Sequence, residues 1–105
     1  MTLSDLVTIL KATGFPVAYS HFQGPPPSIP FITYVEVGSD NMHADNRTWQ
    51  RVRNINIELY TDKKDLQAES TLEALLDEND LPYQTVETYI ESEQLFQKIY
   101  EIGVV

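Results

Sequence analysis

The stretch TWQRVRNINIELY, from Thr48 to Tyr60, decides the fold because its second half alternates between apolar and polar residues. Its apolar residues share one side of an extended chain: Ile55, Ile57 and Leu59. This period of two predicts a strand with one face buried against a core. The first half of the stretch places Trp49, Arg51 and Arg53 on that same side. Two arginines are not easily buried, so we expect this half of the strand to run past the end of the core or to bend there.

Two helices are predicted around this strand, from Leu3 to Thr13 and from Asp65 to Asn79, because apolar residues recur there at helical spacing. Candidate N-caps precede both: Thr2 or Ser4 for the first helix, and Asp62 or Asp65 for the second. The second helix has a predicted core stripe: Leu66, Ala68, Leu72, Leu75 and Leu76. Its acidic residues are expected to form a solvated face: Glu69, Glu73, Asp77 and Glu78.

The remaining apolar runs predict four more strands: Val17–Phe22, Phe31–Val37, Tyr83–Ile90 and Leu95–Val104. The proline-rich segment from Gln23 to Pro30 predicts a stiff extended loop, because each proline removes a backbone donor. Gly38 to Asn46 has the composition of a turn-rich loop, and ESEQ, from Glu91 to Gln94, is short enough for a hairpin turn.

The element order is therefore α-β-β-β-α-β-β. Runs of strands without regular β-α-β alternation indicate the α+β class, with a mostly antiparallel sheet and two helices packed on one side. We find no long linker and no internal repeat, so residues 1–105 are expected to form a single domain.

The composition excludes several classes of function. The net charge of -9 argues against broad binding to nucleic acids or anionic membranes. The absence of cysteine excludes disulfides, cysteine-ligated metal sites and thiol nucleophiles. There is no 18-residue apolar run and no signal-peptide pattern at the N-terminus, so a cytoplasmic location is the default expectation.

Catalytic chemistry has little support in the sequence. His21 is expected mid-strand, and His43 lies in the segment DNMHADN, which lacks the glycine and closing glutamate of a calcium loop. The four glycines are scattered and form no phosphate-binding loop, and there is no nucleophile motif. We therefore expect no enzyme activity, no catalytic residue, no cofactor and no metal.

A candidate interface is the strongest functional signal. Its residues are Arg47, Trp49, Arg51 and Arg53. Arginine and tryptophan are enriched at interface hot spots. In an acidic protein these arginines could meet Glu69, Glu73 or Asp77 of another copy. The alternatives are an exposed strand end with intramolecular salt bridges of little energetic value, and a contact to DNA in the lumen of a ring.

Several stretches together resemble a family of small head–tail joining and tail-completion proteins of tailed bacteriophages and prophages. They are the region from Ser39 to Asp65, the downstream VETYIESEQLFQKIYEI, and the opening LKATGFPVAYSHFQGPPPSIPFITY. The resemblance covers nearly the whole chain and rests on ordinary residues at fixed places, without a catalytic motif.

The resemblance implies a structural virion component of the tail-terminator or tail-completion type. Such proteins form homo-oligomeric rings, commonly hexameric, that contact tail-tube and head-connector proteins. It also implies assembly in the bacterial host cytoplasm and then a place in the virion. We expect no membrane partner and no sequence-specific nucleic acid, in line with the acidic charge. An alternative from charge alone is a monomeric acidic binding module, encoded by a phage, that acts on a host protein.

Overall fold

The structure is a computed structural model that describes the backbone of residues 1–44 and 47–104 and the side chains of residues 1–38 and 52–104. Its elements follow the predicted order: α1 (Leu3–Lys11), β1 (Val17–Tyr19), β2 (Phe31–Ala44), β3 (Arg47–Thr61), α2 (Leu66–Glu78), β4 (Gln84–Ile90) and β5 (Leu95–Val104). The α+β class is thereby confirmed.

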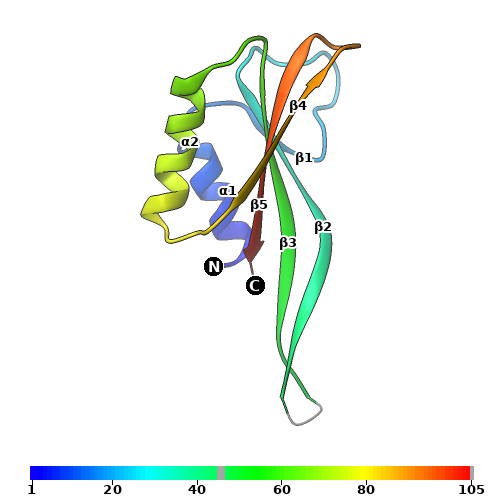
Figure 1. The fold of residues 1–105 in the computed structure, drawn as a ribbon, viewed down its shortest axis with the longest axis vertical. Coiled ribbons are helices and arrows are strands. Elements are labelled where there is room, and N and C mark those ends of the chain that lie inside the picture. The colour runs from blue at the N-terminus through cyan, green and yellow to red at the C-terminus, as the bar shows by residue number, and fades with distance from the viewer. Residues whose placement is uncertain (45–46, 105) are drawn as a thin grey trace.

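The strands form one sheet in the order β1-β2-β3-β5-β4. Among these described strands β1 and β2 run parallel, and the other neighbouring pairs are antiparallel. Figure 1 shows both helices on the same side of this sheet. The sheet therefore has one covered face, towards the helices, and one open face.

The core lies between the covered face and the helices. From β3 it takes the three residues of the alternating stretch: Ile55, Ile57 and Leu59, which are at most 1% exposed. Tyr100, Ile102 and Val104 of β5 lie on the same face. Leu6 and Leu10 of α1 and Leu72 and Leu76 of α2 pack against them. The period-two prediction for β3 is confirmed.

Local sequence signals set the helix boundaries. The hydroxyl of Thr2 accepts a hydrogen bond from the backbone N–H of Asp5, whose carboxylate accepts one from the Thr2 N–H, so α1 begins with a capping box. Asp65 caps α2 through the Ala68 N–H. Gly14 follows α1 with a φ of 84°, which glycine adopts without steric cost.

One predicted loop is largely a strand. The chain from Gly38 to Ala44 continues β2, where a turn-rich loop was expected, and it pairs with β3 down to Ala44↔Arg47. Turn-favouring residues are held in this strand because β3 supplies a backbone partner for them, so pairing overrides local preference. Residues 45 and 46 lie outside the described part of the chain.

Two side-chain placements also differ from expectation. β1 ends at Tyr19, so His21 lies in a loop and not mid-strand; Ser20 has a φ of 67°, which an extended strand does not accommodate. Leu66 is 67% exposed and does not belong to the core stripe. It precedes the buried Ala68 by two positions, which is about 200° around a helix.

Candidate functional site

The predicted interface residues belong to a part of β3 that extends past the core. Among the described residues the last pair between β3 and β5 is Arg53↔Val104, and before Arg53 the strand has described partners only in β2. We call this two-stranded extension, Ser39–Ala44 with Arg47–Val52, the arm. Figure 1 shows it projecting downward from the body formed by the helices and the rest of the sheet. The expectation that the first half of the strand runs past the core is confirmed.

Three of the four candidate residues lie on the arm. Arg47, Trp49 and Arg51 are part of β3 by their backbone, but their side chains lie outside the described residues. Arg53 stands where the arm joins the body, and its side chain is 45% exposed. The structure thus brings the backbone of all four residues to one protruding hairpin strand.

Arg53 makes an ion pair within its own chain. Its Nη1 lies 3.2 Å from Oε1 of Glu36 on the neighbouring strand β2. Both side chains reach solvent, so the pair adds little to stability. For Arg53 the structure therefore matches the alternative of an exposed strand end with an intramolecular salt bridge. The contacts with Glu36 use Nη1 of a guanidinium that has five N–H donors in all, so the side chain has capacity for a further hydrogen bond.

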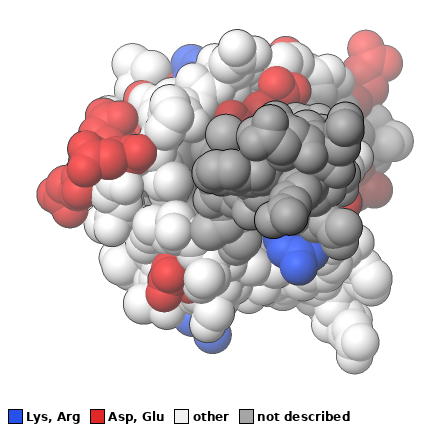
Figure 2. Space-filling view, turned by 90° about the horizontal axis from the view of Figure 1, so that it is seen from below, with Lys and Arg blue, Asp and Glu red and all other residues white. Residues whose placement is uncertain are grey.

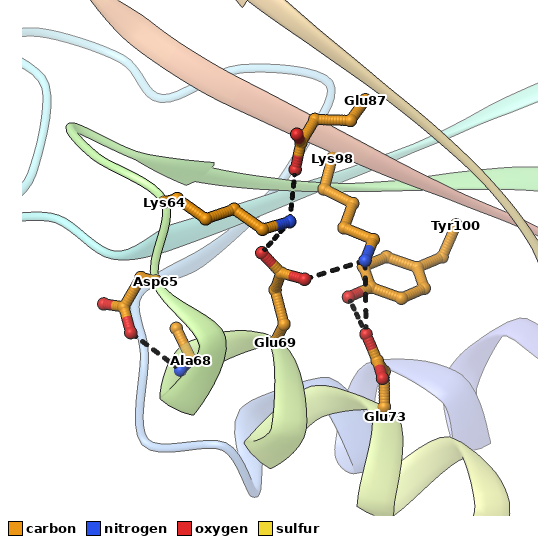
Figure 3. A network of polar contacts seen from close by, with 8 residues as sticks. All are labelled: Lys64, Asp65, Ala68, Glu69, Glu73, Glu87, Lys98 and Tyr100. Carbon is orange, nitrogen blue, oxygen red and sulfur yellow. Dashed lines mark hydrogen bonds and ion pairs between the residues drawn. The ribbon is translucent and has the colours of Figure 1, made fainter.

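The acidic face predicted on α2 is only partly solvated, and the prediction needs correction at Glu69 and Glu73. Glu69 is 7% exposed and lies between two lysines: its Oε1 is 2.7 Å from Lys98 Nζ, and its Oε2 is 2.9 Å from Lys64 Nζ. Figure 3 shows these contacts between α2, β5 and the segment before α2. Glu69 is therefore engaged within its own chain, where a solvated residue was expected.

Charge and burial oppose each other at this network. Burial by itself would raise the pKa of Glu69, but its hydrogen bonds to Lys64 and Lys98 and their charges outweigh that effect and lower the pKa. Burial would likewise lower the pKa of Lys98, yet its hydrogen bond to Glu69 and the nearby carboxylates raise it. The hydrogen bonds of Lys64 to Glu69 and Glu87 raise the pKa of that lysine. All three groups are therefore held in their charged forms.

Glu73 connects the network to the core, and its 30% exposed side chain is solvated only in part, where a fully solvated residue was expected. Its Oε2 accepts a hydrogen bond of 2.7 Å from the hydroxyl of Tyr100, which is fully buried, and lies 3.5 Å from Lys98 Nζ. Burial first, and then this hydrogen bond, raise the pKa of Tyr100, so the phenol stays neutral. Every buried side-chain nitrogen and oxygen of the described residues has a partner. The arrangement fastens α2 to the sheet.

The sequence reasoning missed Lys64 and Lys98. A signal for Lys98 was present, because it shares the face of Tyr100 and Ile102 in β5 and so had to stand over the covered side of the sheet. A lysine in that position needs a carboxylate partner.

The open face carries a second set of hydrogen-bonded polar side chains and two shallow pockets. Glu58 of β3 accepts hydrogen bonds from the Thr33 hydroxyl at 2.7 Å and from the Gln97 amide at 3.2 Å. A hollow of about 290 Å³ lies beside Phe31 and Tyr60, under the proline-rich loop, and another of about 630 Å³ lies beside Glu101. Among the described residues no group of three or more histidines and carboxylates could hold a metal ion.

Acidic residues that remain on the surface gather elsewhere. Three exposed ones close the C-terminal end of α2: Asp77, Glu78 and Asp80. Figure 2, which views the molecule from below, shows Asp and Glu side chains gathered on the left, the side on which the helices lie in Figure 1. Of the three carboxylates proposed as partners for the arginines, Asp77 is the one on this exposed end.

Comparison with known proteins adds no relative: the chain matches no protein-family model and no curated protein.

None of the described helices is long and apolar enough to cross a membrane.

Proposed function

We propose that this chain is a structural assembly protein of a tailed bacteriophage or prophage. It acts as a tail-completion or tail-terminator-like subunit and forms a homo-oligomeric ring at the junction of head and tail. The observation that carries the proposal is the arm, a two-stranded hairpin that projects from the helix-covered body. The sequence resemblance to head–tail joining proteins supports the same reading.

The arm is suited to a contact between subunits for two reasons. Its β3 strand concentrates basic and aromatic residues, Arg47, Trp49 and Arg51, in a chain with a net charge of -9. The end of α2 offers exposed carboxylates, among them Asp77, that the polar network does not use. A head-to-tail contact between two such different surfaces closes into a ring when the rotation between copies permits it.

The first test is light scattering after size exclusion over a concentration series, alone and with tail-tube protein. The wild type is expected to form a ring, and Arg51→Glu/Arg53→Glu is expected to lose that ring. Lys11→Glu/Lys63→Glu is the matched control, because it makes the same change of charge at two exposed lysines outside the arm. A wild type that stays monomeric at high concentration, and binds neither tail-tube nor head-connector protein, contradicts the proposal.

A second candidate function, the acidic binding module, is favoured by the exposed carboxylates at the end of α2. In that case a pull-down from host lysate recovers one host protein in stoichiometric amount. Asp77→Lys/Asp80→Lys then releases that protein, whereas the arm variant retains it.

A further inference from the structure

The two edges of the sheet differ in how well they are protected against further pairing. At one end lies β4, Gln84–Ile90, which pairs with β5 alone among the described residues. Its register to β5 runs without a bulge, and its sequence QTVETYI contains no glycine, proline or lysine. Val86 is 51% exposed and Tyr89 is 46% exposed. Such an edge is a template for another strand, because none of the described strands pairs with its outer N–H and C=O groups.

The opposite edge carries the usual protection. β1 covers only Ile32–Tyr34 of β2. Beyond that point β2 has register shifts between Glu36 and Gly38 and between Met42 and His43. Irregularities of this kind twist an edge away from a prospective partner strand. Of the two edges, β4 is therefore the one that is open to regular strand addition.

The charge on β4 favours a second copy of this chain as the partner. Two copies of a protein with a net charge of -9 repel each other over most of their surfaces. β4 has one acidic residue, Glu87, and Lys64 Nζ lies 2.8 Å from its Oε1. The strand is thus a nearly neutral strip on which like charges hinder approach least.

We infer that β4 pairs antiparallel with β4 of a second copy, about a two-fold axis at Thr88 that joins the two sheets edge to edge. The open face of one sheet must continue into the open face of the other. A shift of one residue would exchange the two faces of the strand, so only every second register is allowed. An axis at Glu87 would set two carboxylates directly opposite each other, which is destabilising. An axis at Thr88 sets Val86 opposite Ile90 of the second copy on the open face and thereby buries the apolar residues of that face together.

The expected dimer is weak. Only the residues from Val86 to Ile90 lie within the shared ladder, so the contact is smaller than the roughly 1,200 Å² of a standard interface. Dimerisation should therefore depend on concentration. It uses a surface other than the arm and does not rest on the proposed function.

Disulfide trapping tests the register directly, because the chain contains no cysteine of its own. Under mild oxidation Thr88→Cys is expected to give covalent dimers, since directly opposite residues have Cα separations that a disulfide spans. Thr85→Cys is the matched control on the same exposed strand. In the proposed register its two copies lie about 20 Å apart, and we expect about tenfold less dimer.

Three outcomes overturn the inference. The first is that Thr88→Cys gives no covalent dimer at high concentration, and the second is that Thr85→Cys gives as much dimer as Thr88→Cys. The third is that the double variant Val37→Cys/Thr88→Cys gives ladders of multimers while Thr88→Cys alone gives no dimer. The last outcome would assign the edge to head-to-tail pairing with β2.

Sedimentation of uncrosslinked protein gives an independent reading. Val86→Lys places a charge on the edge and is expected to raise the dimer dissociation constant about tenfold or more. Val37→Lys, at a similarly exposed valine of the other edge, should leave it unchanged. Equal dissociation constants for wild type and Val86→Lys overturn the inference. Arg51→Glu/Arg53→Glu should keep the β4 dimer, so failure of the ring and failure of this dimer are separate results.

Discussion

The two halves of β3 have the same extended backbone and opposite surroundings. From Asn54 to Tyr60 the strand lies between β2 and β5, with its apolar residues under the helices. From Arg47 to Val52 its partners within the described part of the chain all belong to β2. Backbone pairing is therefore sufficient to prolong the strand beyond the part whose apolar side chains lie under the helices. We expect the body half to hold most of the stability and the arm half to be the part available to other molecules.

The largest effect should follow from a cavity in the body half. Ile57→Ala removes a fully buried side chain and is expected to lower the free energy of unfolding by about 2–5 kcal/mol. Urea denaturation measures this loss. Arg53→Ala, four positions earlier on the same strand, should change it by no more than about 0.5 kcal/mol. Similar losses at both positions would remove the contrast between the halves.

A smaller loss is expected when the polar link between α2 and the sheet is cut. Lys98→Met leaves Glu69, which is 7% exposed, with Lys64 as its remaining cation. The Lys98 side chain is 19% exposed, so water can replace part of the lost interaction. We therefore expect the free energy of unfolding to fall by about 1–3 kcal/mol. Lys63→Met, at an exposed lysine before α2, is the control in the same urea experiment. If the two variants are equally stable, the network does not hold the helix.

The same network predicts a dependence on pH. The folded state lowers the pKa of Glu69 below its ordinary value of 4.5. Its contribution to stability is therefore complete above that value and is lost as the pH falls through the folded pKa. Between pH 6 and 3, Glu69→Gln should lose stability less steeply than the wild type. Parallel curves would show that the carboxylate is not held by its lysines.

The smallest effect belongs to the ion pair at the base of the arm. A double-mutant cycle with Glu36→Gln and Arg53→Gln should give a coupling of about 0–1 kcal/mol that salt reduces further. A larger coupling that salt does not reduce would mean that this pair fixes the arm to the body. The arm half would then contribute to stability, contrary to the difference between the two halves of β3 proposed above.

The fold was largely predictable from the sequence, and the candidate site much less so. Ile55, Ile57 and Leu59 identified the core strand because alternation with period two depends on the chain alone. Gly38 to Ala44 was misassigned because its residues favour turns and only the partner strand makes them extended. Glu69 and Glu73 were taken for solvated residues because a helical pattern does not reveal that Lys98, far along the chain, stands opposite them.

Local patterning accounts for the α+β class, the order of the elements, the helix caps and the buried face of β3, since each depends on residues close together in the chain. Three features appeared only in the folded molecule: the pairing of Gly38–Ala44 with β3 that makes the arm two-stranded, the polar network around Glu69 and the unprotected edge of β4. Each depends on which strand lies beside which, and strand order is a property of long-range pairing that periodicity does not encode.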